Sequence, residues 1–167
     1  DDVLLRLRTN EPEVGTVVLK TTGDPALVLA ADQALLDHAG HWFVREVTHF
    51  IKRTLKRLDL SARSFFAFIE PGNAFAGTLF ELAPNAIHLS AMNAGPYPMS
   101  TGLTRLKTRF YGEPEKVGAA LGHDGPFDSQ EALEAGLVTF APDEIDWDDE
   151  VRLAVESRAA LSPDALT

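Results

Sequence analysis

The chain has 167 residues, 45% of them hydrophobic, and its 25 acidic against 15 basic residues give a formal net charge of -10. This length provides one ordinary hydrophobic core, and the negative field repels a phosphate backbone, which excludes a typical nucleic-acid-binding protein. The absence of cysteine excludes disulfides and thiolate chemistry, and the longest apolar stretches are far shorter than a bilayer span. We therefore expect one cytoplasmic domain without a nucleic-acid or membrane partner.

The N-terminal half predicts two strands and one long helix. Residues 15–20 form a short β-branched run between turn signals, which is typical of a buried strand, and residues 26–29 are a second short apolar run. Apolar side chains recur at helical spacing over residues 41–60 and predict an amphipathic helix. Residues 64–69 (Ser-Phe-Phe-Ala-Phe-Ile) are too short and too apolar for a helix, so they predict a central strand that ends before Pro71.

The C-terminal half alternates helices with short apolar runs. Pro114 and Gly122 bound one helix, Asp128 with Glu131 begins another, and acidic residues open a third, as the helix dipole favours. The predicted elements are a turn and helix over 74–83, a strand at 87–90, a loop at 95–98, helices at 113–121, 128–135 and 146–161, and a strand at 137–140. Alternating strands and helices indicate an α/β fold.

Three ordered motifs resemble the crotonase superfamily, the family of enoyl-CoA hydratases and isomerases. Residues 65–83 are similar to its strand, Gly-rich turn and helix that ends in Glu-Leu-Ala. Residues 92–106 resemble its Gly-x-x-Pro loop and Gly-x-x-Arg-Leu helix, and residues 131–138 resemble its Ala-x-x-x-Gly-Leu-Val step. The resemblance implies a ClpP/crotonase ββα spiral with C-terminal helices, incomplete here and forming a single domain over residues 1–167.

Within this superfamily, the likeness is closer to the C-terminal half of lyases that open the ring of epoxidised benzoyl-CoA with water. The matching stretches are 7–11, 41–46, 64–77, 97–99, 109–111, 146–147 and 161–167. The resemblance implies a CoA-thioester substrate, a semialdehyde CoA thioester and formate as products, and no cofactor. It also implies that catalysis belongs to an N-terminal crotonase repeat that this chain lacks, so we expect a largely structural repeat in a homo-oligomer.

The resemblance also locates the pieces of a crotonase active site. A crotonase holds the thioester oxygen with two backbone N–H groups, which stabilise the developing enolate, and these positions match Ala31 and Thr78. Glu81 matches the first hydratase carboxylate, but the position of the second carboxylate holds Ala91. Side chains after Gly77 crowd a turn that is glycine-rich in the family. The resemblance therefore implies a vestigial site, in which Glu81 is more simply a solvated helix residue.

Other candidate groups have two interpretations each. Tyr97 and Met99 either line an acyl pocket or pack in the core. The predicted core residues are Trp42, Phe43, Phe65, Phe66 and Phe68. A basic cluster on the helix over 41–60 has the charge to bind the phosphates of CoA, although a solvated helix face is the more common explanation. This cluster comprises Lys52, Arg53, Lys56 and Arg57.

Two further features bear on metal binding and on chain length. His38 and His41 fall on one helical face, but no carboxylate lies at ligand spacing from them, so we predict no metal site. Pro84 breaks the helix directly after Glu-Leu-Ala, where the family continues. We therefore expect an omitted or shortened segment at this point.

Three hypotheses about function remain open. The first is a piece of a longer CoA-thioester lyase, which also fits a chain that begins at Asp1 without an initiator methionine or targeting peptide. The second is a free-standing crotonase-like binding or scaffold module without turnover. The third is an autonomous enoyl-CoA hydratase or isomerase that uses Glu81.

Overall fold

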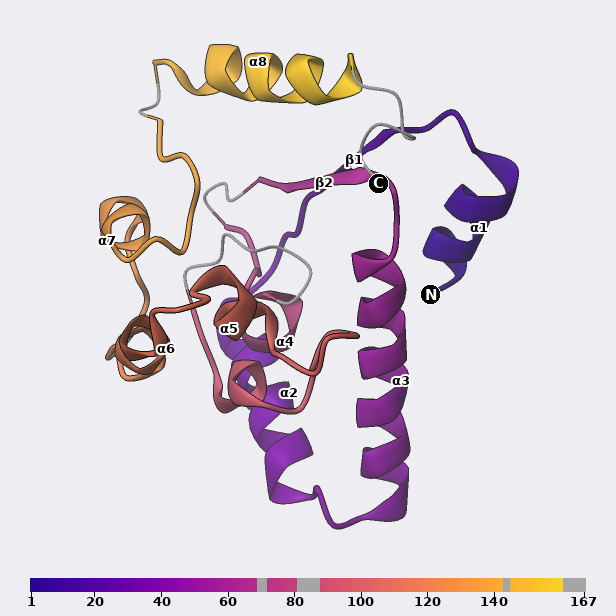
Figure 1. Ribbon diagram of the computed structural model, residues 1–167. Coiled ribbons are helices and arrows are strands. Elements are labelled where there is room, and N and C mark those ends of the chain that lie inside the picture. Colours follow the sequence, from indigo (N-terminus) through magenta and orange to yellow (C-terminus); the bar gives the residue numbers. More distant parts are fainter. Residues whose placement is uncertain (69–71, 81–87, 143–144, 161–167) are drawn as a thin grey trace.

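The computed structural model describes residues 1–68, 72–80, 88–142 and 145–160 as a mixed helical fold with a small sheet (Figure 1). The elements are α1 (Asp2–Asn10), β1 (Thr16–Leu19), α2 (Pro25–Asp37), α3 (Trp42–Asp59), β2 (Ser64–Ala67), α4 (Gly77–Phe80), the 3-10 helix η1 (Ala91–Ala94), α5 (Arg105–Arg109), α6 (Pro114–Leu121), α7 (Ser129–Glu134) and α8 (Trp147–Ala159). This arrangement of helices and a parallel pair of strands is compatible with the predicted α/β class. The crotonase spiral stays a prediction.

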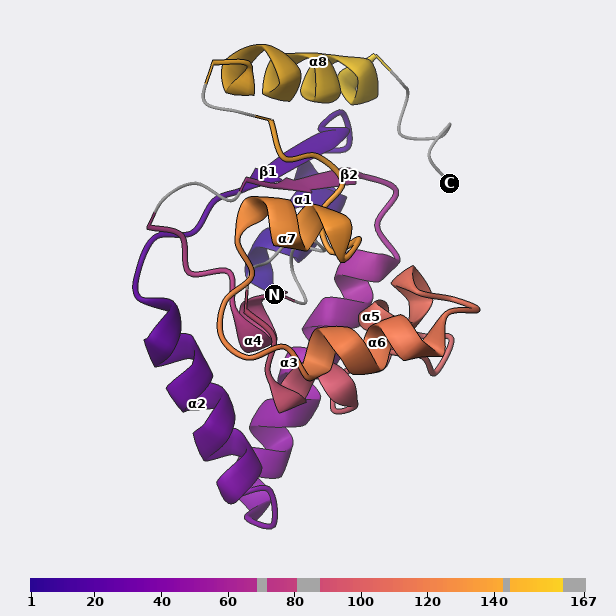
Figure 2. The same ribbon diagram turned by 90° about the vertical axis from the view of Figure 1, so that its left-hand side faces the viewer.

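The sheet of the described residues consists of the parallel pair β1 and β2. Thr16 lies opposite Ser64 and Leu19 lies opposite Ala67. Parallel strands need a crossover connection, and the antiparallel helices α2 and α3 supply it (Figures 1 and 2). The strands predicted at 15–20 and 64–69 are confirmed, but among the described residues β2 has one neighbour rather than the central position that its apolar sequence predicts. The strand predicted at 87–90 is reduced, among its described residues, to a single bridge between Ala76 and His88.

Local sequence signals explain most of the helices. α3 matches the predicted helix, and the His41 side chain caps it by accepting a hydrogen bond from the Phe43 amide at 3.2 Å. Helices α6, α7 and α8 confirm three further predictions within one or two residues at their described ends. Residues 26–29, which read as a separate apolar run, instead begin α2, where Asp24 accepts from the Ala26 amide at 2.8 Å.

The strand predicted at 137–140 is wrong. These residues follow α7 as a turn in which the amides of Leu137 and Val138 both donate to the Ala132 carbonyl, at 2.8 and 3.2 Å. Gly136 permits this turn through its positive φ of 72°. Leu137 and Val138 are apolar because they are buried in the core, and a short apolar run cannot by itself distinguish a strand from such a turn.

Apart from Leu55, the buried hydrophobic residues of the described chain lie between Ala74 and Val138. The main hydrophobic cluster consists of Phe75, Phe80, Leu106, Phe110, Val117, Ala120, Phe127, Ala132, Leu137 and Val138. A smaller cluster joins Leu55 of α3 to Met92 and Tyr97. Within residues 1–68, all of which are described, the buried side chains are those of Asp32 and Leu55. Residues 1–68 therefore contribute few fully buried side chains to the core.

Candidate functional site

A buried carboxylate, that of Asp32, connects three elements at the centre of the molecule. Asp32 lies on α2 and is 2% exposed. Its side chain accepts hydrogen bonds from the Thr78 amide at 2.8 Å, from the Thr78 hydroxyl, and from the Ser90 hydroxyl at 2.6 Å. Thr78 belongs to α4 and Ser90 caps η1. Buried charges persist when hydrogen bonds satisfy them, and these donors provide that satisfaction.

The backbone around Gly77 is shaped to admit this carboxylate. Gly77 has a φ of +45°, and a Cβ atom there would lie 2.0 Å from Oδ2 of Asp32. Its carbonyl accepts from the Asn93 side chain at 2.9 Å, and Asn93 Oδ1 in turn accepts from the Ser90 amide at 2.9 Å. Asn93 thus fixes the two segments that bind Asp32, and the site depends on glycine at position 77.

The two predicted oxyanion donors have different places in this arrangement. Thr78 lies in the first turn of α4, directly after Gly77, and its amide donates to Asp32. Ala31 precedes Asp32 inside α2, where backbone amides belong to the helical hydrogen-bond ladder. The structure therefore brings the two predicted segments together. However, the Thr78 amide, which is predicted to bind a thioester oxygen, donates its hydrogen bond to the Asp32 carboxylate.

Tyr97 packs in the core rather than in an open acyl pocket. Its ring is buried with Leu55 and Met92, and its hydroxyl lies 3.3 Å from the Thr78 hydroxyl. Met99 is half-buried and accepts from the Thr108 hydroxyl at 3.4 Å. Of the two interpretations of Tyr97, the structure supports packing in the core.

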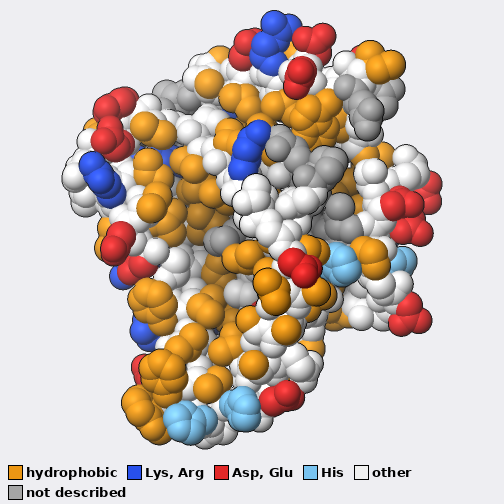
Figure 3. Space-filling model, turned by 180° about the vertical axis from the view of Figure 1, so that it is seen from behind, with side chains coloured by type: hydrophobic (Ala, Val, Ile, Leu, Met, Phe, Trp, Pro, Cys, Tyr) orange, Lys and Arg blue, Asp and Glu red, His pale blue; other side chains and the backbone are white. Residues whose placement is uncertain are grey.

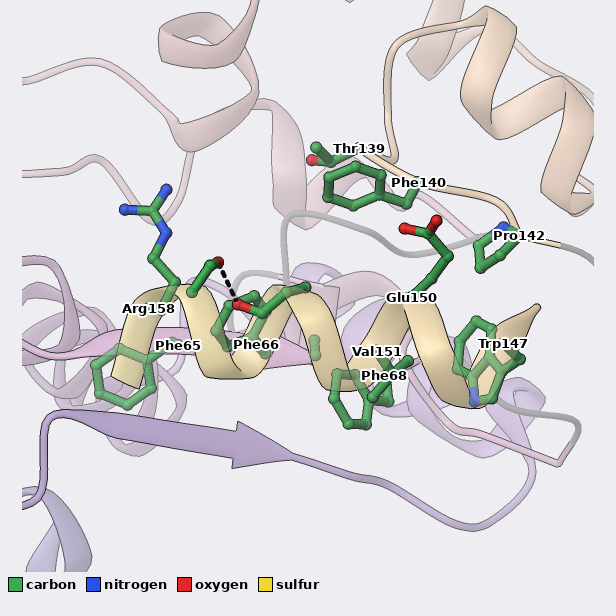
Figure 4. A pocket seen from close by; sticks show the side chains of 13 residues that line it. Phe65, Phe66, Phe68, Thr139, Phe140, Pro142, Trp147, Glu150, Val151 and Arg158 are labelled. Atoms are coloured by element: carbon green, nitrogen blue, oxygen red, sulfur yellow. Dashed lines mark hydrogen bonds between the residues drawn. The ribbon is translucent and has the colours of Figure 1, made fainter. Parts of the chain in front are cut away.

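A cavity of about 400 Å³ lies between β2, α8 and residues 139–142. Aromatic side chains of Phe66, Phe68, Phe140 and Trp147 contribute to its walls (Figure 4). Phe68 and Trp147 meet edge to face, with their ring centroids 6.3 Å apart. The cavity shows that α8 covers the sheet without filling the space beneath it.

Comparison with known proteins gives one strong match, and no protein-family model matches the chain. The chain is 48% identical over 182 aligned residues to the benzoyl-CoA-dihydrodiol lyase of Aromatoleum evansii. The chain is similar to the C-terminal part of this lyase. The match covers 100% of the chain but 33% of the lyase, so the chain spans about a third of the length of this relative. The likeness to the wider crotonase superfamily stays a prediction.

The match does not decide the roles of the predicted carboxylate positions. Glu81 and Pro84 lie outside the described residues. Ala91 is the exposed first residue of η1. The aligned region is longer than the chain itself, so it includes positions at which this chain has no residue. The catalytic role of Glu81 and the location of a shortened segment therefore stay predictions.

The basic cluster follows one side of α3. Its members are Lys52, Arg53, Lys56 and Arg57, and their spacing of four residues places them on adjacent turns. Arg57 forms an ion pair with Asp1, so one of the four already has a partner within the chain. Binding of CoA phosphates by this cluster stays a prediction.

The prediction that His38 and His41 share one helical face is wrong, because they lie at the two ends of the turn between α2 and α3. His41 caps α3, and His38 follows the last residue of α2. Among the described residues, no group of three or more His, Asp or Glu side chains has a metal-binding arrangement. In the same part of the chain, no helix combines the length and apolarity needed to cross a bilayer.

The residue that sequence reasoning missed is Asp32. A signal was present, because a carboxylate stands within the otherwise apolar stretch of α2. Its hydrogen-bond partners, however, lie 46 and 58 positions away in the sequence. No local pattern identifies a contact between residues so distant, so this part of the site required the structure.

Proposed function

We propose that this chain is the C-terminal third of a benzoyl-CoA-dihydrodiol lyase and that its role in that enzyme is structural. The complete enzyme opens the ring of epoxidised benzoyl-CoA with water and releases formate and a semialdehyde CoA thioester. The observation that carries the proposal is the 48% identity to such a lyase over the whole chain. The rest of the enzyme supplies catalysis and the CoA-thioester site.

The Asp32 site supports a structural role for this segment. A crotonase-type reaction needs two free backbone donors at the position where negative charge develops on the thioester oxygen. Here the Thr78 amide binds Asp32, and a second anion at that amide would meet a carboxylate of the same charge. The predicted oxyanion site is therefore occupied by the protein itself, and Ala31 offers no free amide from the interior of α2.

Product analysis tests this proposal. We expect the complete lyase to release formate from epoxidised benzoyl-CoA and the 167-residue chain alone to release none. In the complete lyase, Glu81→Gln leaves kcat within about twofold, because a residue that contacts no reacting group contributes little to the barrier. Formate release by the chain alone, or a loss of activity of about 100-fold or more in the Glu81→Gln enzyme, would show that this segment catalyses.

The same purified chain also tests the alternative of an autonomous hydratase. An autonomous hydratase would hydrate crotonyl-CoA and lose that activity on Glu81→Gln. Under our proposal the chain hydrates crotonyl-CoA no faster than a buffer control.

A further inference from the structure

A group of large aromatic side chains on α3 lies open to solvent instead of in the core. Trp42 is 65% exposed, Phe43 56% and Phe50 51%, so the prediction that Trp42 and Phe43 belong to the core is wrong. Trp42 and Phe43 touch edge to face, with ring centroids 5.7 Å apart. We call these three residues the α3 stripe.

The α3 stripe lies on one side of its helix. Phe43 and Phe50 are seven residues apart, which places them on the same face two turns apart. The face of α3 that packs inside the molecule is different, because it carries Leu55 toward Met92 and Tyr97. Apolar side chains gather over the lower part of the molecule, where α2 and α3 lie, when it is viewed from behind (Figure 3). Contiguous exposed apolar surface of this kind marks an interaction site.

The charge beside the α3 stripe restricts its partner. Arg53 and Arg57 are exposed on α3, one and two turns beyond Phe50, in a chain whose net charge is -10. Arg57 already forms an ion pair with Asp1, and Glu46 is exposed between the two phenylalanines of the stripe, so this face carries charges of both signs. A partner with an apolar surface and a carboxylate opposite Arg53 is complementary to it.

We infer that the α3 stripe is the docking surface for the remaining two thirds of the lyase polypeptide. This inference rests on the proposed function. The match covers 33% of the related lyase. About two thirds of a lyase of that length would therefore lie outside this chain, and in a compact enzyme that part would contact the chain. Trp and Phe residues flanked by Arg have the composition of energetically dominant interface positions.

Hydroxyl-radical footprinting of the complete lyase tests the inference directly. We expect Trp42, Phe43 and Phe50 to react about tenfold more slowly than their intrinsic reactivity allows, because an interface excludes water from such residues. Tyr111 is the internal control, since it is 81% exposed in the turn that follows α5. We expect Tyr111 to react as an exposed tyrosine.

A matched pair of substitutions provides the second measurement. In the complete lyase, Phe50→Asp lowers the thermal midpoint by about 5 °C or more, because it buries a carboxylate in the interface. Tyr111→Asp shifts the midpoint by less than about 1 °C.

Three outcomes overturn the inference. One is full reactivity of the α3 stripe in a lyase that still releases formate, which leaves the proposed function intact. Another is an equal midpoint shift for the two substitutions. The third is protection of the α3 stripe that disappears on dilution to single polypeptides, which would assign the stripe to a second copy. Absence of formate release from the complete lyase would instead contradict the proposed function, whatever the footprint.

Discussion

Residues 74–138 and residues 1–60 differ in how they use their hydrophobic side chains. The first of these regions contains every buried hydrophobic residue of the described chain except Leu55. The second contains most of the exposed large ones, which are Val3, Leu5, Val18, Leu27, Trp42, Phe43, Phe50 and Leu60. Burial of apolar area is the main favourable term in folding. Residues 74–138 therefore contain most of the core, with Leu19 and Leu55 packed against it, whereas residues 1–60 leave much of their apolar surface exposed.

The two regions are joined at a few well-defined contacts. Asp59 at the end of α3 accepts from Arg105 at 2.7 and 2.8 Å, in a largely buried ion pair. Asp32 of α2 binds Thr78 and Ser90. These polar contacts fix the geometry between the regions. They add little apolar burial. We therefore expect substitutions in residues 74–138 to lower the free energy of unfolding more than comparable substitutions in residues 1–60.

A pair of leucine truncations gives the largest expected difference. Leu106 is 1% exposed in the main cluster, and Leu27 is 70% exposed on α2. We expect Leu106→Ala to reduce the free energy of unfolding by about 3 kcal/mol through lost burial and a cavity. Leu27→Ala changes it by less than about 0.5 kcal/mol. Denaturant titration measures both, and similar losses would remove the distinction between the regions.

Removal of the Asp32 carboxylate tests the main polar contact between the regions. We expect Asp32→Ala to cost about 2 to 3 kcal/mol, because the Thr78 and Ser90 donors lose a buried partner. Sodium formate restores part of the thermal midpoint by occupying the vacated space, whereas sodium chloride at equal concentration does not. An identical effect of the two salts would mean that the donors do not recognise a carboxylate.

Two glycine substitutions test how closely the backbone at Gly77 approaches Asp32. Gly77→Ala places a methyl group 2.0 Å from Asp32 Oδ2 at a φ of +45°, and we expect a loss of about 2 kcal/mol from overpacking and backbone strain. Gly118→Ala is the control, since Gly118 lies in α6 with no atom within 4 Å of an added Cβ. We expect it to stabilise the chain by about 0.5 to 1 kcal/mol. Thermal unfolding of both variants reports the difference in sign.

Helix caps give the smallest effects. Asp128 forms a capping box with Glu131 at the start of α7, and Asp24 caps α2. Each Asp→Ala substitution costs its own helix about 1 kcal/mol. We expect Asp128→Ala to lower global stability by that amount, whereas Asp24→Ala acts mainly on local opening of α2. Calorimetry gives the first quantity and amide exchange gives the second.

Local patterns predicted the elements whose signals lie within one segment. α3 has a long helical period, α6 has Pro114 and Gly122 at its ends, and α7 has an acidic cap. The same patterns failed where tertiary context decides. Leu137 and Val138 are apolar because they enter the core as part of a turn, and Trp42 is apolar although it lies on the surface.

Only half of the candidate site could be predicted from sequence. The motif around Gly77 places Thr78 correctly at the start of a helix. The ligand of that turn is a side chain from α2, 46 positions earlier in the sequence, and nothing local indicates the contact. Whether a glycine turn binds a substrate oxygen or an internal carboxylate is a tertiary property.

Amide hydrogen exchange of α3 is the most direct test of the central claim, which is that residues 1–60 depend on the rest of a lyase and residues 74–138 do not. We expect the α3 amides of the isolated chain to exchange at least about tenfold faster than those of the packed helices α6 and α7. In the complete lyase, the α3 amides slow to the rate of α6 and α7. Equal protection of α3, α6 and α7 in the isolated chain would contradict the account.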